Sequence, residues 1–216
     1  MREEPLPEPE FWVLEVGAVA HAAAPTLAFR LRIRDRSERP IYTVALTVQI
    51  QLEPIQREHD ADTRARLREV FGDTERWGDT ARSVTWAACE LLVPSFTGST
   101  SFELRVPCST DLELATTRYL QALPDGAVPL AFHFNGSVFY SGPDDRLQLT
   151  QVPWHTQAQG KLPLATWREA VGDRGGLARL GNGTHAALGE YRERRGLPSL
   201  DAAVADLLAG AREEIS

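Results

Sequence analysis

The sequence predicts a mainly β chain of the α+β class: an antiparallel β-sandwich with one or two inserted helices and a C-terminal helical extension. Alternating apolar and polar side chains recur through the first three-quarters of the 216 residues, which is the period of half-buried strands. Asn135-Gly136 separates two aromatic-rich runs, and this pair favours a type I′ hairpin turn. Strand patterns precede helical patterns instead of alternating with them, which argues against βαβ units.

Composition divides the chain into three parts. Residues 1–10 contain three prolines and four glutamates, which predicts a mobile acidic arm. Residues 11–153 carry the strand patterns and are expected to form the sandwich domain. Residues 154–216 carry helical patterns, and we expect them to form an extension packed on the sandwich.

The first strands are expected at residues 11–19, 27–33 and 42–52. In the second of these, four apolar residues alternate with arginines. The apolar positions are Leu27, Phe29, Leu31 and Ile33. In the third, the apolar positions are Tyr42, Val44, Leu46, Val48, Ile50 and Leu52. We expect the second and third runs to pair as one long antiparallel hairpin with one face on a core.

The middle of the chain adds a helix, a loop and two strands. Asp60 or Asp62 can cap a short helix that stops at Gly72. Residues 74–80 are polar and predict a loop. Strands are expected at 83–93 and 102–106.

A second inserted helix is expected next. Thr110 and Glu113 have the spacing of a capping box, in which the two side chains satisfy each other's free backbone donors. The helix should end near Ala122, before the hairpin centred on Asn135-Gly136. A strand at 147–152 closes the β-rich part.

The extension is expected to hold a short helix after Pro163, a helix near 185–195 and a last helix from Ser199 to about Arg212. The last helix carries an apolar stripe at helical spacing. Its members are Leu200, Val204, Leu207 and Leu208. Packing on the protein's own sheet is the simplest role for this stripe, and docking on another subunit is the alternative.

Charge and cysteine content restrict the function classes. The net charge of −7 argues against binding to nucleic-acid backbones, which depends on basic surfaces. The N-terminus lacks the basic residues followed by an apolar run that are typical of a signal peptide. No apolar run approaches the roughly 20 residues that span a bilayer. We therefore expect a cytoplasmic protein with reduced cysteines and no membrane span.

Metal and catalytic sites have weak support. Cys108 and His155 are possible ligands of a metal, but neither has a second ligand at the close spacing of a zinc site. His133 lies between Phe132 and Phe134 and should point away from their buried face. No Gly-x-Ser-x-Gly elbow or phosphate loop occurs, so no cofactor and no catalytic residue are assigned.

Arg30, Arg32 and Arg34 form a basic stripe on the polar face of one expected strand. This stripe is either a solvated outer face that discourages edge pairing or a docking surface for an acidic partner. Among the strands it is the best candidate for partner binding.

Several segments resemble an uncharacterised family of actinobacterial proteins that are often encoded beside high-affinity uptake [NiFe] hydrogenases. The segments are Val93-Pro-Ser-Phe-Thr-Gly-Ser-Thr-Ser-Phe-Glu-Leu, Val106-Pro-Cys-Ser-Thr-Asp-Leu-Glu, Phe134-Asn-Gly-Ser-Val-Phe-Tyr, Val152-Pro-Trp and Trp167-Arg-Glu. The resemblance covers most of residues 11–200 and implies a genomic setting, but no catalytic residues.

We therefore expect a non-enzymatic accessory or assembly protein that binds a protein partner, such as a redox-enzyme subunit. The alternatives are a small-molecule or metal-binding module that uses Cys108 and His155, and a hydrolase of unrecognised type.

Overall fold

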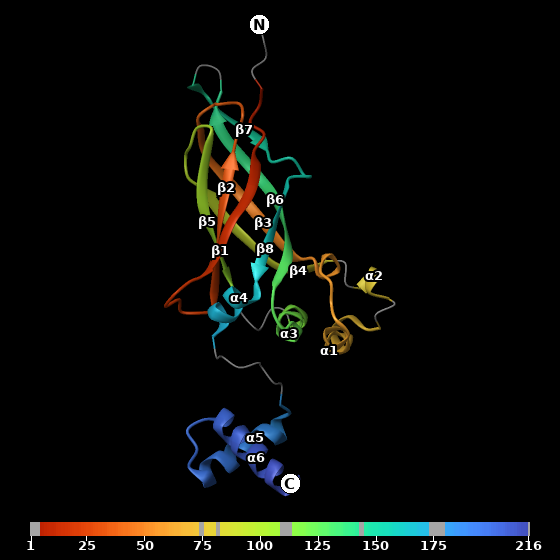
Figure 1. The fold of residues 1–216 in the computed structure, drawn as a ribbon. Helices are drawn as coiled ribbons and strands as arrows, with labels where there is room; N and C mark the ends of the chain where they lie inside the picture. Colours follow the sequence, from red (N-terminus) through yellow and green to blue (C-terminus); the bar gives the residue numbers. More distant parts are fainter. Residues whose placement is uncertain are drawn as a thin grey trace. The chain divides into compact units, whose positions relative to one another are not determined.

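The fold is taken from a computed structural model, which describes residues 5–73, 76–80, 83–108, 114–142, 145–172 and 180–215. The chain divides into two compact units, Met1–Arg174 and Gly175–Ser216. The first unit holds the sheets (Figure 1), and the second is helical. No helix among the described residues has both the length and the apolar character needed to cross a membrane.

Two antiparallel sheets form the first unit. The smaller has the order β1-β2-β5, and the larger has the order β4-β3-β6-β7 with β8 also paired to β6. The strands are β1 (Glu10–Ala18), β2 (Thr26–Arg34), β3 (Ile41–Leu52), β4 (Val84–Val93), β5 (Ser99–Pro107), β6 (Ala127–Ser141), β7 (Leu147–Gln151) and β8 (Gln157–Pro163). A mainly β, α+β chain is confirmed.

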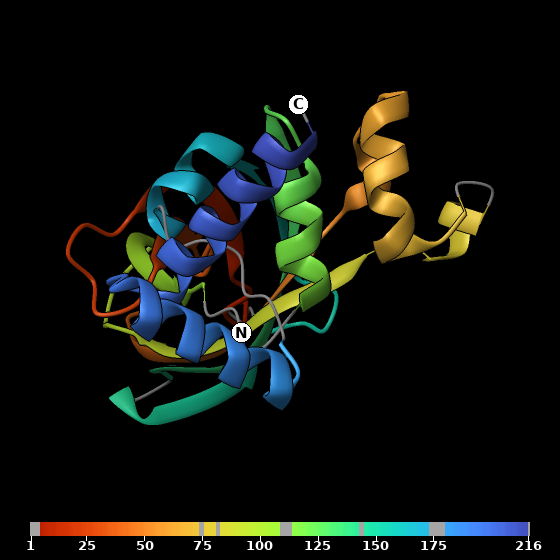
Figure 2. The same ribbon diagram turned by 90° about the horizontal axis from the view of Figure 1, so that it is seen from below.

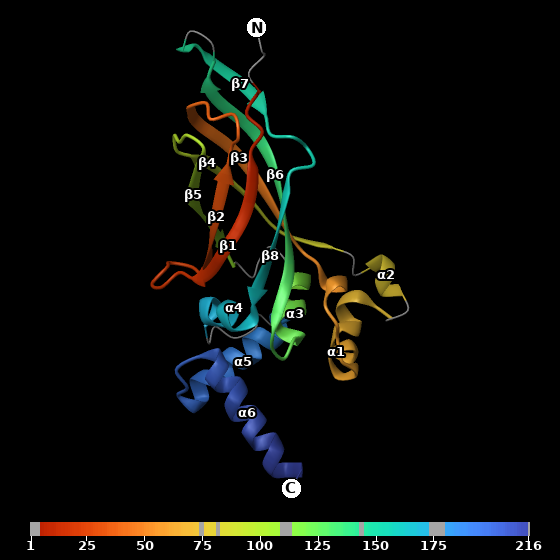
Figure 3. The same cartoon turned by 45° about the horizontal axis from the view of Figure 1, so that its top comes forward.

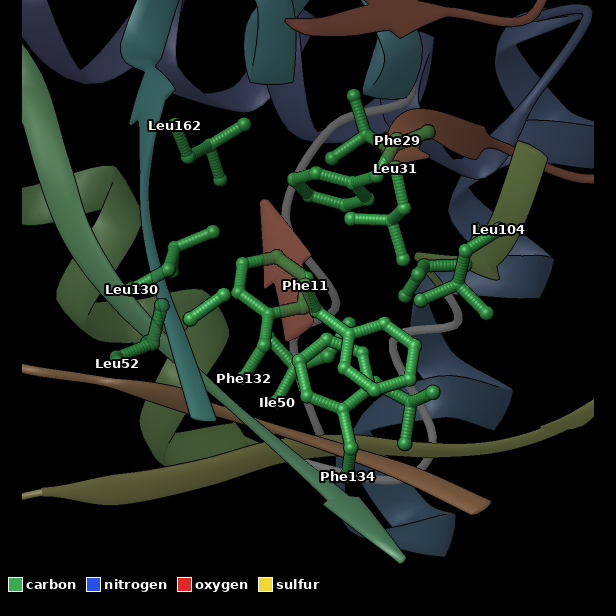
Figure 4. Close-up of a cluster of buried hydrophobic side chains, with 14 of the residues drawn as sticks. Phe11, Phe29, Leu31, Ile50, Leu52, Leu104, Leu130, Phe132, Phe134 and Leu162 are labelled. Atoms are coloured by element: carbon green, nitrogen blue, oxygen red, sulfur yellow. The ribbon is translucent and has the colours of Figure 1, made fainter. Parts of the chain in front are cut away.

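One hydrophobic core joins the inner faces of both sheets. The four apolar residues of β2 are fully buried, as the alternation predicted. Phe11 of β1 stacks on Phe134 of β6 with ring centroids 4.0 Å apart. Phe29 of β2 meets Phe132 of β6 edge to face at 5.3 Å. Figure 4 shows these rings gathered between the strands of the two sheets.

The predicted hairpin of residues 27–33 and 42–52 is wrong. β2 pairs with β1 and β5, whereas β3 pairs with β4 and β6. Alternation shows which face of each strand is buried, but it does not show which strand is hydrogen-bonded at its edge, so two strands from facing sheets give the same pattern as a hairpin. A register shift between Ile41 and Thr43 also turns Ile41 into the core and leaves Tyr42 at the surface, which period two alone did not predict.

The predicted turn at Asn135-Gly136 is also wrong, because both residues lie inside the continuous strand β6. Gly136 has φ +152°, and a Cβ built on it would lie 1.9 Å from the carbonyl oxygen of Ala45. The glycine is therefore required by the close approach of β3 and not by a reversal of the chain.

The helices of the first unit lie after β3, before β6 and after β8. They are η1 (Pro54–Gln56), α1 (Ala61–Phe71), α2 (Trp77–Thr80), α3 (Leu114–Ala122) and α4 (Leu164–Val171). Asp60 caps α1 by accepting a hydrogen bond from the Thr63 backbone N–H at 2.6 Å, as expected from the sequence. The predicted loop at 74–80 contains α2 instead. Figure 2 shows α1 and α3 as neighbours. The predicted capping box of Thr110 and Glu113 lies outside the described residues.

Two features of the structure differ from the pattern on which the expected domain boundaries were based. β8 pairs with β6 and lies beside β1 (Figure 3), so the sheets extend beyond residue 153 and the compact units divide after Arg174. β8 was missed because it has glutamine, lysine and glycine where a strand usually has β-branched residues. In the expected arm, Pro7 and Pro9 are buried, so residues 5–9 lie against the fold.

The second unit is a pair of helices, α5 (Asn182–Arg195) and α6 (Leu200–Ile215). Gly196 ends α5 in the left-handed conformation with φ 64°. Asp206 joins the helices, because it accepts hydrogen bonds from the Tyr191 hydroxyl at 2.6 Å and from Arg195. Both helices were predicted from the sequence.

Candidate functional site

The three predicted arginines stand in one row on the outer face of β2. Arg30, Arg32 and Arg34 are exposed, while the residues between them point into the core. Their placement follows from the strict alternation of β2, since successive side chains of a strand point to opposite faces.

Acidic residues lie opposite both ends of this row, since Glu10 of β1 is opposite Arg34 and Glu15 is opposite Arg30, although Glu10 forms its ion pair with Arg36. Arg30 pairs with Glu15 of β1 at 2.9 Å, and Glu103 of β5 lies opposite Arg30 on the other side. Glu103 also pairs with Arg105 at 2.7 Å. The charge of Arg30 is therefore balanced by acidic neighbours, and these exposed ion pairs contribute little to the free energy of folding.

Arg32 lies between Trp12 of β1 and Ser101 of β5 in the register of the sheet. Trp12 is 41% exposed, and a register shift between Val13 and Glu15 also leaves Leu14 38% exposed. Within the described residues, neither Arg32 nor Arg34 forms an ion pair. We call Trp12, Leu14, Arg32 and Arg34 the Trp12–Arg32 surface.

A cleft of about 510 Å³ adjoins this surface. It lies between residues 5–9, the start of β1 and the approach to β8, and Trp12, Asp35 and His155 are among its lining residues. Asp35 is 2% exposed, and its carboxylate accepts hydrogen bonds from the backbone N–H of Glu8 at 2.8 Å and of Ser37 at 3.0 Å. Asp35 therefore fixes one wall of the cleft.

The structure does not bring Cys108 and His155 together. Cys108 follows β5 and donates its backbone N–H to Pro25, beside the start of β2. His155 lies in the cleft with Asp35, which follows the end of β2. Burial raises the pKa of the Cys108 thiol to about 11, which disfavours the thiolate that binds metals. Among the described residues, no group of three or more His, Cys, Asp and Glu side chains could hold a metal ion.

An aromatic cluster around His59 was missed in the sequence. His59 is 8% exposed, and its Nε2 lies 3.5 Å from the Tyr119 hydroxyl oxygen. Trp77 meets the imidazole edge to face at 5.5 Å, and Phe71 contacts both Trp77 and Tyr119. These residues come from four separate segments, so no local spacing could have revealed the cluster. It joins α1, α2 and α3 into one subdomain of the first unit.

The His59 cluster should make stability depend on pH. Burial lowers the pKa of His59, and nearby Arg57 lowers it further, whereas an unfolded histidine has a pKa of about 6.5. The unfolded chain therefore binds the proton more readily, and the stability that is present above that pKa is lost as the pH falls. We expect the melting temperature to fall between about pH 7.5 and pH 5, and to fall less steeply in His59→Gln. Equal slopes in His59→Gln and in a His185→Gln control would contradict this.

A family model matches residues 6–216 and carries the description "Family of unknown function (DUF6084)". The chain belongs to the DUF6084 family. The match includes the Trp12–Arg32 surface, the cleft and the His59 cluster. The predicted membership in an uncharacterised family is confirmed, and the actinobacterial and hydrogenase setting stays a prediction. A comparison of this DUF6084 chain with curated proteins finds no match.

Solved structures give only remote similarities to this DUF6084 member. A solution structure assigned to the late embryogenesis abundant (LEA) proteins is 12% identical, with 73% of this chain and 72% of that chain covered and a TM-score of 0.32. The ApaA protein from Bordetella pertussis is 14% identical, with 74% and 97% covered and a TM-score of 0.29. Beta-glucosidase 3B from Thermotoga neapolitana is 11% identical, with 72% of this chain and 17% of that chain covered and a TM-score of 0.28. Similarities at this level carry no argument about function.

Proposed function

We propose that this protein is a non-enzymatic accessory protein that binds a protein partner through the Trp12–Arg32 surface. The observation that carries the proposal is the pairing of exposed Trp12 with Arg32 across two adjacent strands. Tryptophan and arginine are the residue types most enriched where alanine substitution weakens protein complexes. Because both are held on a sheet, little backbone entropy is lost on binding.

Electrostatics indicate the chemistry of the partner. Arg32 and Arg34 present positive charge on a protein whose net charge is −7, so the surface differs in sign from the molecule as a whole. An acidic segment of a partner would be attracted to these arginines, whereas the net charge of the whole chain would repel it. The adjoining cleft, which includes Leu6 and Phe11, offers apolar contacts to the same segment.

We place this partner among redox-enzyme subunits, specifically those encoded near uptake [NiFe] hydrogenases. This part of the proposal rests on the resemblance of the segments at residues 93–104, 106–113 and 134–140 to a family found in that setting. An assembly or accessory role suits a surface that binds protein.

Charge reversal at Arg32 tests the proposal. In Arg32→Glu we expect affinity purification from the native host to lose the hydrogenase subunits that the wild-type protein recovers, with affinity for the purified subunit reduced at least tenfold and the melting temperature unchanged. Arg118→Glu, on the exposed face of α3, is the matched control and should bind normally. Undiminished binding by Arg32→Glu would refute the assignment of the surface.

A further inference from the structure

Three arginines surround the turn between α3 and β6. Arg66 donates from Nε to the Ala122 carbonyl at 2.9 Å. Arg168 donates from Nη2 to the carbonyls of Leu123 at 2.7 Å and Pro124 at 2.8 Å. The accepting carbonyls lie at and beyond the C-terminus of α3, where backbone acceptors lack helical partners.

Arg57 is the third, and it donates from both of its terminal nitrogens. Its Nη2 donates to the Asp125 carbonyl at 2.6 Å and its Nη1 to the Ala127 carbonyl at 2.9 Å. The guanidinium also lies against Gly126, where an added Cβ would be 3.1 Å from Nη1. Because a guanidinium has five N–H donors, three of those of Arg57 remain for a ligand.

These contacts orient the arginines but do not neutralise them, since carbonyl groups carry no net charge. Within the described residues, none of Arg57, Arg66 and Arg168 forms an ion pair with a carboxylate. Two acidic residues, Glu53 and Asp125, have backbones hydrogen-bonded to residues at this site. Asp60 also lies near Arg66, which helps the hydrogen bonds from Thr63 to lower the pKa of that carboxyl, so three acidic residues lie near the three guanidinium groups. Of the three arginines, only Arg57 lines the adjoining cleft.

A cleft of about 730 Å³ opens beside Arg57. Gln56 and Arg57 lie on one side, and Gln159 and Lys161 of β8 lie on another. Lys161 is exposed and sits opposite Pro129 of β6 in the register of the sheet. It is the only lysine of the chain. The cleft thus pairs a fixed, forked donor with a flexible ammonium group.

We propose that this cleft binds the phosphate group of a small soluble molecule, held between the free donors of Arg57 and the ammonium group of Lys161. Two cations match the two charges of a phosphate monoester at neutral pH better than the single charge of a carboxylate. Arginine binds phosphate oxygens in a forked geometry, and lysine binds them as a point charge. This site is separate from the Trp12–Arg32 surface. If the cleft does not bind phosphate, the proposed function is unaffected.

Calorimetric titration with glycerol phosphate, with acetate at equal ionic strength as the comparison anion, tests the site. We expect glycerol phosphate to bind and acetate not to bind. Binding should weaken as the pH falls below about 6, where the phosphate loses its second charge. Equal binding of acetate, or no binding of glycerol phosphate, would overturn the proposal.

Substitutions and vesicles complete the test. Lys161→Gln leaves the hydrogen bonds of Arg57 to the 125–127 turn in place, and we expect it to raise the Kd for glycerol phosphate about tenfold. The control Arg118→Gln should leave this Kd unchanged. Arg57→Ala removes the ligand donors and also the two hydrogen bonds that Arg57 makes to the carbonyls of Asp125 and Ala127. The loss of binding in this variant is therefore compared with wild type only if the melting temperature is unchanged. An unchanged Kd in Lys161→Gln would overturn the proposal. Co-sedimentation with phosphatidic acid vesicles, without binding of glycerol phosphate, would show that the cleft binds the phosphate of a lipid headgroup. That result would overturn the proposal of a soluble ligand.

Discussion

Gly136→Ala is expected to destabilise the first unit by about 3 kcal/mol or more. The new Cβ would lie 1.9 Å from the carbonyl oxygen of Ala45, which belongs to the backbone of β3 and cannot rotate away. The backbone conformation at φ +152° is also unfavourable for any residue with a side chain. Urea unfolding, followed by tryptophan fluorescence, measures the change in the free energy of unfolding.

Gly17→Ala is the matched control for this substitution. Gly17 also lies in a strand, but a Cβ built on it meets no atom within 4 Å. We expect Gly17→Ala to change the free energy of unfolding by less than about 1 kcal/mol. Similar unfolding curves for the two variants would show that β3 and β6 do not approach as closely as described.

Phe132→Ala is expected to cost about 3–5 kcal/mol and to lower the melting temperature by roughly 10 °C. Phe132 is fully buried, meets Phe29 of the opposite sheet, and lies where a Cβ on Gly160 would be 2.9 Å from its ring. Its removal would therefore leave a cavity between β2, β6 and β8. Calorimetry or thermal unfolding by circular dichroism measures the effect.

Phe139→Ala provides the comparison within the same strand. Phe139 is only partly buried, and its side chain lies on the other face of β6 from the core. We expect a loss of less than half that of Phe132→Ala. If both substitutions were equally costly, the assignment of the inner face of β6 would be wrong.

Period-two patterns predicted which side chains are buried better than they predicted which strands are neighbours. The apolar positions of β2, and those of β3 from Val44 to Leu52, lie in the core as expected. The pairing of β2 with β3 was wrong because alternation specifies a face and not a partner. The turn predicted at Asn135-Gly136 is wrong because a glycine can be required by a close backbone approach as well as by a turn.

The candidate site was predicted in part. The arginine row followed from β2, but Trp12 was not connected to it, because β1 was not known to pair with β2. The exposure of Leu14 depends on a register shift that the sequence does not mark. The chemistry of Cys108 and His155 suggested a shared metal site, but Cys108 lies beside the start of β2 and His155 lies near Asp35, after its end.

Photo-crosslinking from position 12 tests the central proposal most directly. A benzoyl-phenylalanine placed at Trp12, in cells that contain the hydrogenase subunits, should crosslink to an acidic segment of one of them, and adding Arg32→Glu should abolish the product. The same probe at Leu149, an exposed residue of β7 in the other sheet, should give no such product. Crosslinks from Leu149 but not from Trp12 would contradict the proposal that the Trp12–Arg32 surface binds the partner.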